Sequence, residues 1–462
     1  MGKTLFRKLL DPFIVVQIDE KTVLVFVNRH PGHEVTSPVP FDIMRVKGSK
    51  PPHPELCFFV GDHNTSTMGG WEAIVDKHSL LQLETLDKNC GEFGIICYGL
   101  GHHDNGVIHS VVPGLGIALP GDNVRCGDSH TTTYGGIGVL SSGVGSSEVH
   151  IMFETQCLEQ KISDTMRITI NGKLNQGVTS KDVILYIIGQ IGTSGGTGKA
   201  IEFAGEVFRD MSVLGRLIVC NMAKEMGAKF ALVAVDDKTI EYAMNTRGFR
   251  ESQHKEERFV YWQTLHSDPD AVFDTEHEFN ASDILPQVTW GTSPDQVIAI
   301  SDSIPVIDSA LPEDEKKHHR ESLKYMQLKE GTKMSDVEVQ SIFIGSCTLA
   351  GIEDLREAAG VVKGKKIASN IEQALVVPPS MDIKRQAEGE GLDRDFIEAG
   401  FEWRNPGCSA CLAMNADKVP PGKRCASTSN RPFEGRQGPD SMTHLVSALT
   451  AAKAAIDGHF SA

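Results

Sequence analysis

The sequence FIGSCT at residues 343–348, followed further along by NPGCSAC at residues 405–411, decides how the rest of this chain is interpreted. A short apolar strand ends in a Gly-Ser-Cys turn, and a second turn adds two cysteines at C-x-x-C spacing. Cysteine thiolates hold iron–sulfur clusters, and three ligands in place of four would leave one iron open. A C-x-x-C pair alone is weak support, so a structural zinc site and buried free thiols stay as alternatives.

Polar motifs also follow other predicted strands. The motif GDHN at residues 61–64 follows the apolar run CFFV, and GDSHT at residues 127–131 follows Val-Arg-Cys. A third polar group, Asn-Arg-His at residues 28–30, follows a predicted hairpin. Ligands of open α/β sheets lie outside the carboxyl ends of the strands. The three motifs therefore predict one shared crevice.

These motifs occur in one order together with SNRPFEGR at residues 429–436, and at these residues the chain resembles the aconitase superfamily. The motifs are most similar to those of the large subunits of 3-isopropylmalate dehydratase, and the resemblance runs from about Leu5 to about Gly458. It implies an α/β, aconitase-like fold with three α/β/α domains around a central iron–sulfur site and without the swivel domain. The length also suggests about three domains, which we place at residues 1–165, 166–285 and 286–462, the last carrying the cluster cysteines.

The resemblance also implies roles for individual residues. One [4Fe–4S] cluster would be held by Cys347, Cys408 and Cys411. Catalytic roles would fall to the acids and histidines Asp62, His63, His109, Asp128, His130 and Glu225. Substrate would be bound by Ser129, Asn221, Asn430, Arg431 and Arg436. An acid beside a histidine orients the ring and raises its basicity, and the arginine fork suits a carboxylate. The simpler alternatives are hydrogen-bonded histidines at strand ends and surface salt bridges.

The activity that the resemblance implies is isomerisation of a 2-hydroxy diacid by dehydration and rehydration, with 2-isopropylmalate as the first candidate. Homocitrate/homoaconitate, dimethylmalate and other alkylmalates are related candidates, and a cluster-free regulatory or RNA-binding protein is a third. A separate small subunit would supply the swivel domain and the catalytic serine. Positions that depart from the motifs of the dehydratase, and so leave the substrate open, are Val39, Gly114, Leu115, Tyr134 and Leu349.

Composition restricts the setting of this activity. Lys+Arg 45 against Asp+Glu 61 gives a net charge of −16, which disfavours nucleic-acid and anionic-membrane binding. The ten cysteines among 462 residues are too sparse for a disulfide framework. We find no signal-peptide core and no apolar run of about 18–20 residues. We therefore expect a cytoplasmic protein that does not cross a membrane.

Four segments lead to further expectations. The glycine-rich residues 135–145 predict close backbone packing in preference to phosphate binding. Residues 192–199 resemble a phosphate loop, but Ala200 stands where Ser or Thr would bind magnesium, so we reject nucleotide binding there. Residues 107–112, which include His109, are predicted to form a strand. The polar residues 247–266 are predicted to form a surface insertion.

Overall fold

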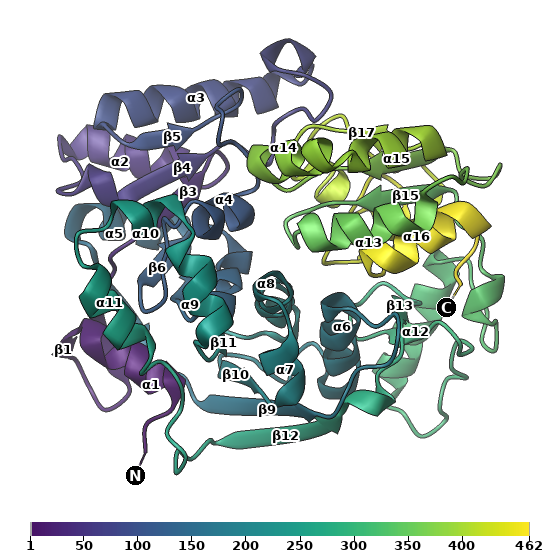
Figure 1. Ribbon diagram of the computed structural model, residues 1–462, viewed down its shortest axis with the longest axis horizontal. Helices are drawn as coiled ribbons and strands as arrows, with labels where there is room; N and C mark the ends of the chain where they lie inside the picture. Colours follow the sequence, from purple (N-terminus) through teal and green to yellow (C-terminus); the bar gives the residue numbers. More distant parts are fainter. Residues whose placement is uncertain (1, 462) are drawn as a thin grey trace. The chain divides into compact units, whose positions relative to one another are not determined.

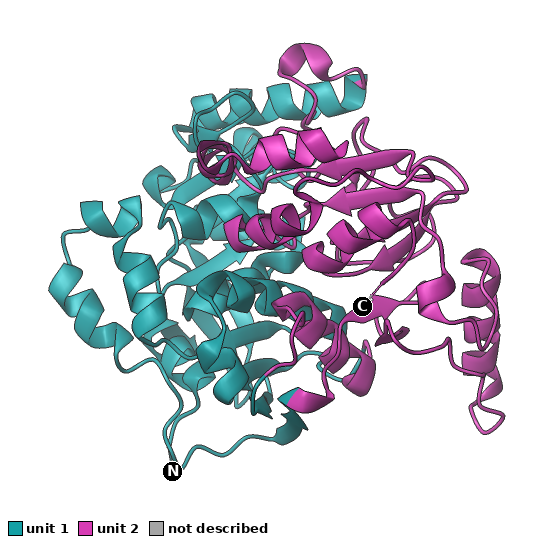
Figure 2. Cartoon of the chain, turned by 45° about the vertical axis from the view of Figure 1, so that its right-hand side comes forward, with its two compact units in different colours: residues 1–64, 77–173, 194–281 teal, residues 65–76, 174–193, 282–462 magenta. Residues whose placement is uncertain are grey.

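The computed structural model describes residues 2–461 and divides into two compact units (Figures 1 and 2). Unit 1 contains the residues up to Asn64, Lys77–Lys173 and Ser194–Ala281. Unit 2 contains Thr65–Asp76, Leu174–Thr193 and the residues from Ser282 onward. Parallel sheets with helices occur in both units, which confirms the α/β class. The strands of each sheet come from only one of the three predicted domain ranges, except that β9 begins at Thr165, one residue before the predicted start of the second domain. The division into three domains itself stays a prediction.

A parallel sheet of unit 1 carries the predicted acid and histidine motifs. Strands β3, β4 and β5 pair in parallel, as do β6 and β7. A parallel bridge between Arg29 and Val124 sets β6 beside β3, so the strand order is β7-β6-β3-β4-β5. Strand β3, the first in the chain, therefore lies in the middle of the sheet. Strands β4 and β5 extend the sheet on one side of β3, and β6 and β7 then extend it on the other side. The strands are β3 (His30–His33), β4 (Cys57–Val60), β5 (Ile96–Tyr98), β6 (Asn123–Cys126) and β7 (Leu140–Gly143).

Unit 2 contains a five-stranded parallel sheet with an equivalent order, β17-β16-β15-β18-β19. Its apolar strands and the helices that pack on them form one continuous core. The strands are β15 (Ser341–Ile344), β16 (Gln373–Val376), β17 (Glu402–Trp403), β18 (Arg424–Ser427) and β19 (Met442–Leu445). The helices that follow them are α13 (Ile352–Val362), α14 (Met381–Glu390), α15 (Leu392–Ala399) and α16 (Ala448–Asp457).

The remaining strands of unit 1 form two more sheets. The antiparallel sheet β1-β2-β8 begins with the predicted hairpin, and the parallel sheet has the order β11-β10-β9-β12. The first contains β1 (Ile14–Gln17), β2 (Thr22–Phe26) and β8 (Cys157–Lys161), and the second contains β9 (Thr165–Asn171), β10 (Ala200–Ala204), β11 (Phe230–Val233) and β12 (Thr275–Asn280). The helices of this unit are α1 (Leu5–Leu10), α2 (Pro38–Lys47), α3 (Lys77–Phe93), α4 (Ile108–Gly114), α5 (Ser146–Thr155), α7 (Glu206–Asp210), α8 (Val213–Met222), α9 (Asp237–Met244), α10 (Arg247–Glu251) and α11 (Lys255–Trp262).

Unit 2 is completed by a hairpin and two helices. Strands β13 (Gln287–Thr289) and β14 (Val297–Ala299) pair antiparallel. Helix α6 (Ser180–Ile191) starts with a capping box formed by Thr179 and Asp182, and Asp182 also accepts the backbone N–H of Gln287 at 2.8 Å. Helix α12 (Glu313–Tyr325) is largely exposed, as its charged sequence predicts.

One prediction about a segment is wrong, and a second is incomplete. Residues 107–112 begin helix α4 instead of a strand, because the Asp62 carboxylate accepts the N–H of Ile108 at 2.9 Å and caps the helix from another part of the chain. Residues 247–266 are also more than a surface insertion. They form α10 and α11, and Phe249, Trp262 and Leu265 are buried in the core of unit 1.

The glycines after residue 134 serve close packing, as the sequence predicts. A Cβ atom on Gly135 would lie 1.6 Å from the carbonyl oxygen of Ala231, and one on Gly136 would lie 2.6 Å from the backbone nitrogen of Leu217. Both contacts are with backbone, which cannot rotate away. The 3-10 helix η4 (Ser129–Ile137) therefore packs directly on β11 and α8.

We expect Gly135→Ala to destabilise the protein by about 3 kcal/mol or more, because the added methyl group forces two backbone segments apart. Gly91→Ala is the matched control, because Gly91 lies within α3 and a Cβ atom added there would point into open space, with no neighbouring atom of the described residues within 4 Å. Alanine is there the better helix former by about 0.5–1 kcal/mol. Urea unfolding of both variants checks this, and equal effects would contradict the packing role of Gly135.

Candidate functional site

Two groups of predicted site residues form, one in each unit. The first, which we call the acid–histidine cluster, consists of the predicted side chains of Asp62, His63, His109, Asp128, His130 and Glu225 together with those of His33 and Glu34, which were not predicted. Its members follow β3, β4 and β6 or lie on α4 and on the 3-10 turn η5 (Ala223–Met226), and all are buried. Loops after the first and fourth strands meet where the strand order reverses, which is where such sheets bind ligands.

Glu34 holds the loop that carries the first acid–histidine pair. Its carboxylate accepts the backbone N–H groups of Asp62 at 3.3 Å, His63 at 2.8 Å and Asn64 at 2.7 Å. The side chain of Glu34 is fully buried, and this burial is the largest cause of its raised pKa. The nearby negative charge of Asp62 raises the pKa of Glu34 further. Three backbone donors on one carboxylate leave the loop little freedom to move.

Within this loop, Asp62 and His63 form a close pair. The Asp62 carboxylate lies 2.5 Å from Nδ1 of His63, so the ring presents Nε2 to the rest of the cluster. Burial alone would lower the pKa of His63, but the charge and hydrogen bond of Asp62 outweigh it and raise the pKa to about 10. The same pairing lowers the pKa of Asp62 although burial opposes this. At neutral pH, His63 is therefore a protonated ring held by a carboxylate.

Asp128 is the carboxylate on which four histidines converge. His109 Nε2 lies 3.0 Å from it, and the backbone N–H of His130 donates to it at 2.7 Å. His63 and His33 each place Nε2 within 4 Å of its other oxygen, at 3.6 and 3.8 Å. Burial would raise the pKa of Asp128, but His109 and His130 hold it well below its ordinary value. The centre of the cluster is thus a stable anion.

His130 connects Asp128 to the residues of the next segment. Its Nε2 lies 2.8 Å from the Glu225 carboxylate, and its Nδ1 lies 3.1 Å from the Ser129 hydroxyl. Burial lowers the pKa of His130, but its hydrogen bonds to Asp128 and Glu225 raise it overall. Asn221 donates to the hydroxyl of Thr133 at 2.9 Å. Asn221 and Glu225 do not lie on one continuous α-helix, because α8 ends at Met222 and a 3-10 turn follows.

The cysteines gather in unit 2 at the equivalent point of its sheet. Cys347 follows β15 and Asn430 follows β18, the two strands between which the order reverses. The Sγ atoms of Cys347 and Cys411 lie 3.7 Å apart, well beyond the ~2.05 Å of a disulfide. The Asn430 amide donates to Cys347 Sγ at 3.3 Å, and its oxygen lies 3.7 Å from Cys411 Sγ. Cys408 is buried and immediately precedes the 3-10 turn η8 (Ser409–Cys411).

The backbone around these cysteines is strained. Seven residues other than glycine have a left-handed φ in the described part of the chain, and four of them flank the cysteines: Ser346 (φ 90°), Leu349 (φ 64°), Ser409 (φ 51°) and Ala413 (φ 52°). A left-handed conformation costs a residue with a side chain about 1–2 kcal/mol. Such strain concentrates at functional sites, and here it accompanies the turns that present the sulfur atoms.

Asp417 holds the loop of Cys408 and Cys411 in place. Its carboxylate accepts hydrogen bonds from the hydroxyls of Thr67 and of Ser409, the latter at 2.7 Å. The side chain of Asn415 donates to the Ser409 carbonyl at 3.2 Å, and Asp417 is in turn within 3.5 Å of Arg404. The left-handed Ser409 is therefore anchored through its side chain and its backbone.

Arg436 brings a positive charge to the sulfur atoms. Its Nη2 lies 3.9 Å from Cys411 Sγ, its guanidinium lies over the ring of Phe433, and its buried Nε has no hydrogen-bond partner among the described residues. Arg431 follows Asn430 in the same loop and is half-buried. A guanidinium with an open donor is suited to binding a carboxylate.

These contacts fit a metal cluster held by three thiolates. Donors directed at sulfur are among the protein features that tune iron–sulfur clusters, and Asn430 and Arg436 supply them. A family model described as the aconitase family (aconitate hydratase) matches residues 7–458. The chain belongs to the aconitase family. Members of this family typically bind an iron–sulfur cluster, and membership supports an iron–sulfur hydro-lyase activity, as the sequence predicts.

A second possible metal-ligand set lies within the acid–histidine cluster. Ligand atoms of His33, Glu34, Asp62 and His63 lie within 4.8 Å of one another. The carboxylates already accept backbone N–H groups and the proton of His63, however. These hydrogen bonds use oxygen atoms that a metal ion would need.

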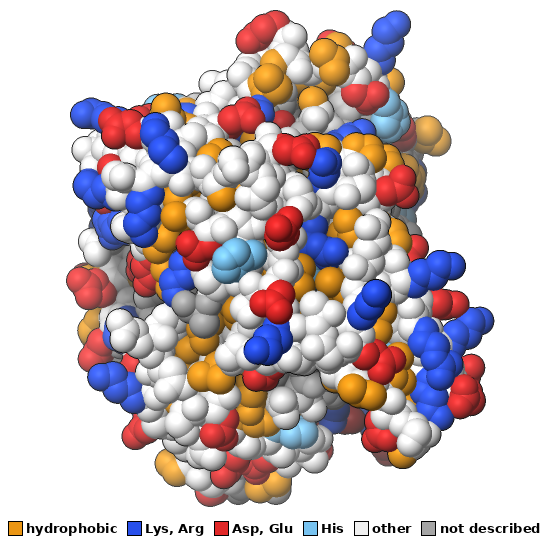
Figure 3. Space-filling view, turned by 90° about the vertical axis from the view of Figure 1, so that its right-hand side faces the viewer, with side chains coloured by type: hydrophobic (Ala, Val, Ile, Leu, Met, Phe, Trp, Pro, Cys, Tyr) orange, Lys and Arg blue, Asp and Glu red, His pale blue; other side chains and the backbone are white. Residues whose placement is uncertain are grey.

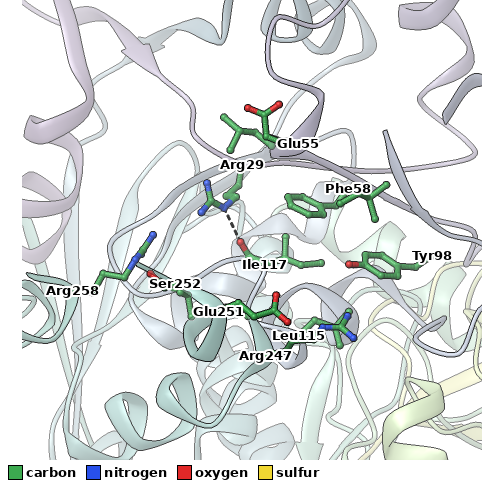
Figure 4. Close-up of a pocket in the computed structure, with 15 residues that line it drawn as sticks. Arg29, Glu55, Phe58, Tyr98, Leu115, Ile117, Arg247, Glu251, Ser252 and Arg258 are labelled. Carbon is green, nitrogen blue, oxygen red and sulfur yellow. Dashed lines mark hydrogen bonds between the residues drawn. The ribbon is translucent and has the colours of Figure 1, made fainter. Parts of the chain in front are cut away.

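The cavity in Figure 4 is separate from the acid–histidine cluster. It has a volume of about 310 Å³ and is lined by Glu55, Leu56 and Phe58 at the start of β4, whereas Asp62 and His63 follow the end of that strand. Arg247 from α10 and Arg258 from α11 form another wall. Leu115 also lines it, so this departure from the dehydratase motifs lies away from His109, at the other end of α4.

The other positions that depart from the dehydratase motifs differ in how close they lie to predicted site residues. Gly114 and Val39 are exposed, Val39 on α2. Tyr134 is fully buried with its ring 5.7 Å from that of His109. Leu349 is buried in the loop after Cys347 and has a left-handed φ, a conformation that is uncommon for residues other than glycine. Tyr134 and Leu349 are therefore the departures that adjoin predicted site residues.

Two features bear on membrane insertion and on binding to nucleic acids or anionic membranes, which the composition disfavours. In the part of the chain that the structure describes, no helix combines the length and apolar character needed to span a membrane. On the face shown in Figure 3, basic and acidic side chains are interspersed.

Sequence reasoning missed Glu34, His33 and Asp417. The strand that carries His33 reads His-Pro-Gly-His, which lacks every usual sign of a β-strand. Gly32 is required because a Cβ atom there would lie 2.3 Å from the ring of Phe59. The only sequence signal for Glu34 is its place in the motif EVTSP, and Asp417 has none.

The His63–Asp62 pair makes stability depend on pH. The folded pKa of His63, about 10, lies above its ordinary value of 6.5, so the pair contributes stability that is fully present below pH 6.5 and is lost as pH rises through about 10. We expect the free energy of unfolding to fall more steeply over this range in the wild type than in Asp62→Asn. Urea unfolding at a series of pH values measures this.

The control for this experiment is the exposed pair of His53 and Glu55, whose atoms lie 2.8 Å apart. Exposed pairs contribute little, so Glu55→Gln should leave the pH dependence unchanged. If the free energy of unfolding changed with pH equally in the wild type and in Asp62→Asn, the buried pair would not be what keeps the proton on His63.

Proposed function

We propose that this chain is the large subunit of an iron–sulfur hydro-lyase that converts 2-isopropylmalate to 3-isopropylmalate in leucine biosynthesis. The observation that carries the proposal is the convergence of Asn430 and Arg436 on the sulfur atoms of Cys347 and Cys411 at the strand reversal of unit 2. Family membership supports the reaction class. The choice of substrate rests on the resemblance of the motifs. Homocitrate, dimethylmalate and other alkylmalates are the alternatives that the test below separates.

In this proposal, Cys347, Cys408 and Cys411 hold one [4Fe–4S] cluster. When bound, the cluster supplies a Lewis acid for the hydroxyl and a carboxylate of the substrate. Arg436, with Arg431 and Asn430, binds carboxylate. The open Nε of Arg436 is a donor available for that contact.

The protein groups that move protons are in unit 1. His63 is protonated at neutral pH and is oriented by Asp62, so we assign it the proton that departs with the hydroxide. Asp128 holds His109 and His130 in place, and Glu225, Ser129 and Asn221 complete this side.

We also propose, from the resemblance, that a separate small subunit supplies a catalytic serine and that the protein is cytoplasmic.

The ligand assignment is tested by Cys411→Ser in anaerobically purified protein. We expect the visible absorbance of the cluster and the bound iron to be lost or strongly reduced, because a thiolate ligand is removed. Cys425→Ser is the control, since Cys425 is equally buried in β18 but is not a predicted ligand. A colourless, zinc-containing wild-type protein, or full iron content in Cys411→Ser, would contradict the assignment.

The substrate is tested by mixing the chain with its small subunit and following the ultraviolet absorbance of the alkene product. We expect turnover of 2-isopropylmalate to exceed that of homocitrate and dimethylmalate. Arg436→Lys should raise KM about tenfold or more, because the planar fork is lost. The control is Arg394→Lys on the exposed surface of α15. Turnover of another diacid in preference would reassign the substrate, and RNA binding without turnover would favour the regulatory alternative.

A further inference from the structure

A second cavity of unit 1 contains one buried and one half-buried positive charge, which no part of the proposed reaction uses. The cavity has a volume of about 550 Å³ and is lined by residues of β6 and β8 and by Glu148 of α5, together with Lys229 just before β11, Lys21 and the turn at Thr197 and Gly198. The inner wall contains Arg125, which is 1% exposed, and the half-buried Lys229. Lys21, Glu159, Lys161 and Asp164 at its rim are exposed.

Arg125 is buried without a neutralising carboxylate. Its Nη1 donates to the side-chain oxygen of Asn123 at 2.5 Å and to the carbonyls of Val124 at 2.9 Å and Leu140 at 3.0 Å, all uncharged. Its Nη2 is buried and has no hydrogen-bond partner among residues 2–461. The guanidinium lies over the ring of Phe230, 5.2 Å from its centroid, but is paired with no carboxylate of the described residues. A buried charge without a counter-charge is costly, and burial lowers the pKa of Arg125 to about 9.

Lys229 adds a second charge beside the first. Its amine donates to the Gly143 carbonyl at 3.4 Å, and its pKa is lowered by burial and by the nearby charge of Arg125. Glu148 is the acid that favours both charges, but its carboxylate already caps α5 by accepting the N–H of Gly145 at 2.8 Å. The inner wall therefore has more positive than negative charge.

The cavity in Figure 4 lacks this imbalance. There Arg247 pairs with Asp104 at 2.9 Å, and Arg258 and Arg29 lie 3.6 and 3.9 Å from Asp122. Each of those arginines lies within 4 Å of an acidic side chain, whereas neither Arg125 nor Lys229 forms such an ion pair with any of the described residues.

We propose that the cavity at Arg125 and Lys229 binds a small dianion of the phosphate class, either phosphate or a phosphate ester. Two positive charges close enough to affect one another suit a compact dianion better than an extended diacid. Arginine and lysine are the usual phosphate-binding cations. The volume exceeds what a phosphate ion needs and lies in the range of small-ligand sites, so it leaves room for an organic substituent. The turn at Thr197 and Gly198 contributes shape and not backbone donors, since the N–H groups of both residues are already bonded to carbonyls.

The test is thermal unfolding of the full chain in inorganic phosphate, compared with chloride and malonate at equal ionic strength. An anion that binds the folded state raises Tm by mass action. We expect phosphate to raise the Tm of the wild type by at least about 2 °C over both other salts. Lys229→Gln should abolish the difference. Lys88→Gln, the same charge change on exposed α3, should retain it.

A second measurement assigns the effect to the site without any variant. Phosphate should slow the acylation of Lys229 by an amine-specific reagent at least about threefold, followed by mass spectrometry, and should leave Lys88 unaffected. Equal Tm values in phosphate and chloride, an unchanged effect in Lys229→Gln, or binding of malonate in place of phosphate would overturn the proposal. Neither measurement requires a cluster or activity, so failure here leaves the hydro-lyase proposal standing.

Discussion

In each unit the first strand of a parallel sheet lies in the middle, and this order brings the loop after the first strand against the loop after the fourth. In unit 1 the contact is between His33 at the end of β3 and Asp128 after β6, 3.8 Å apart. In unit 2 it is between Cys347 after β15 and Asn430 after β18, 3.3 Å apart. The two orders, β7-β6-β3-β4-β5 and β17-β16-β15-β18-β19, are equivalent. The same topological constraint thus brings buried acids and histidines together in one unit and cysteine sulfur atoms together with Asn430 in the other.

The electrostatics of the two sites differ because their partners differ. In unit 1, buried acids stabilise buried histidines, so that Asp128 stays ionised and His63 stays protonated although burial opposes both charges. In unit 2, the neutral amide of Asn430 and the positively charged guanidinium of Arg436 lie beside the sulfur atoms of Cys347 and Cys411. The first arrangement suits the movement of protons, and the second suits anionic ligands that bind a metal and a carboxylate substrate.

Backbone contacts make these arrangements rigid, at a cost in stability. Gly135 and Gly136 let backbone segments touch in unit 1, and Ser346 and Ser409 adopt left-handed conformations in unit 2. The strained Ser409 is compensated by its hydrogen bond to Asp417. Leu349 lacks such a side-chain hydrogen bond, since an apolar side chain cannot make one, although a leucine is costly at φ 64°.

The α/β class, the family and the side chains that form most of the acid–histidine cluster could be predicted from the sequence, as could the approach of Cys347 to Cys411. They could be predicted because each depends on a short motif whose residues lie within a few positions of one another. The sequence predicted the wrong structure for residues 107–112, because the cap that starts α4 comes from Asp62. It also could not identify Glu34 as the anchor of the Asp62–Asn64 loop, or Arg125 as a buried charge without a carboxylate partner. These properties depend on which distant groups meet and how far water is excluded from them, and only the tertiary structure decides both.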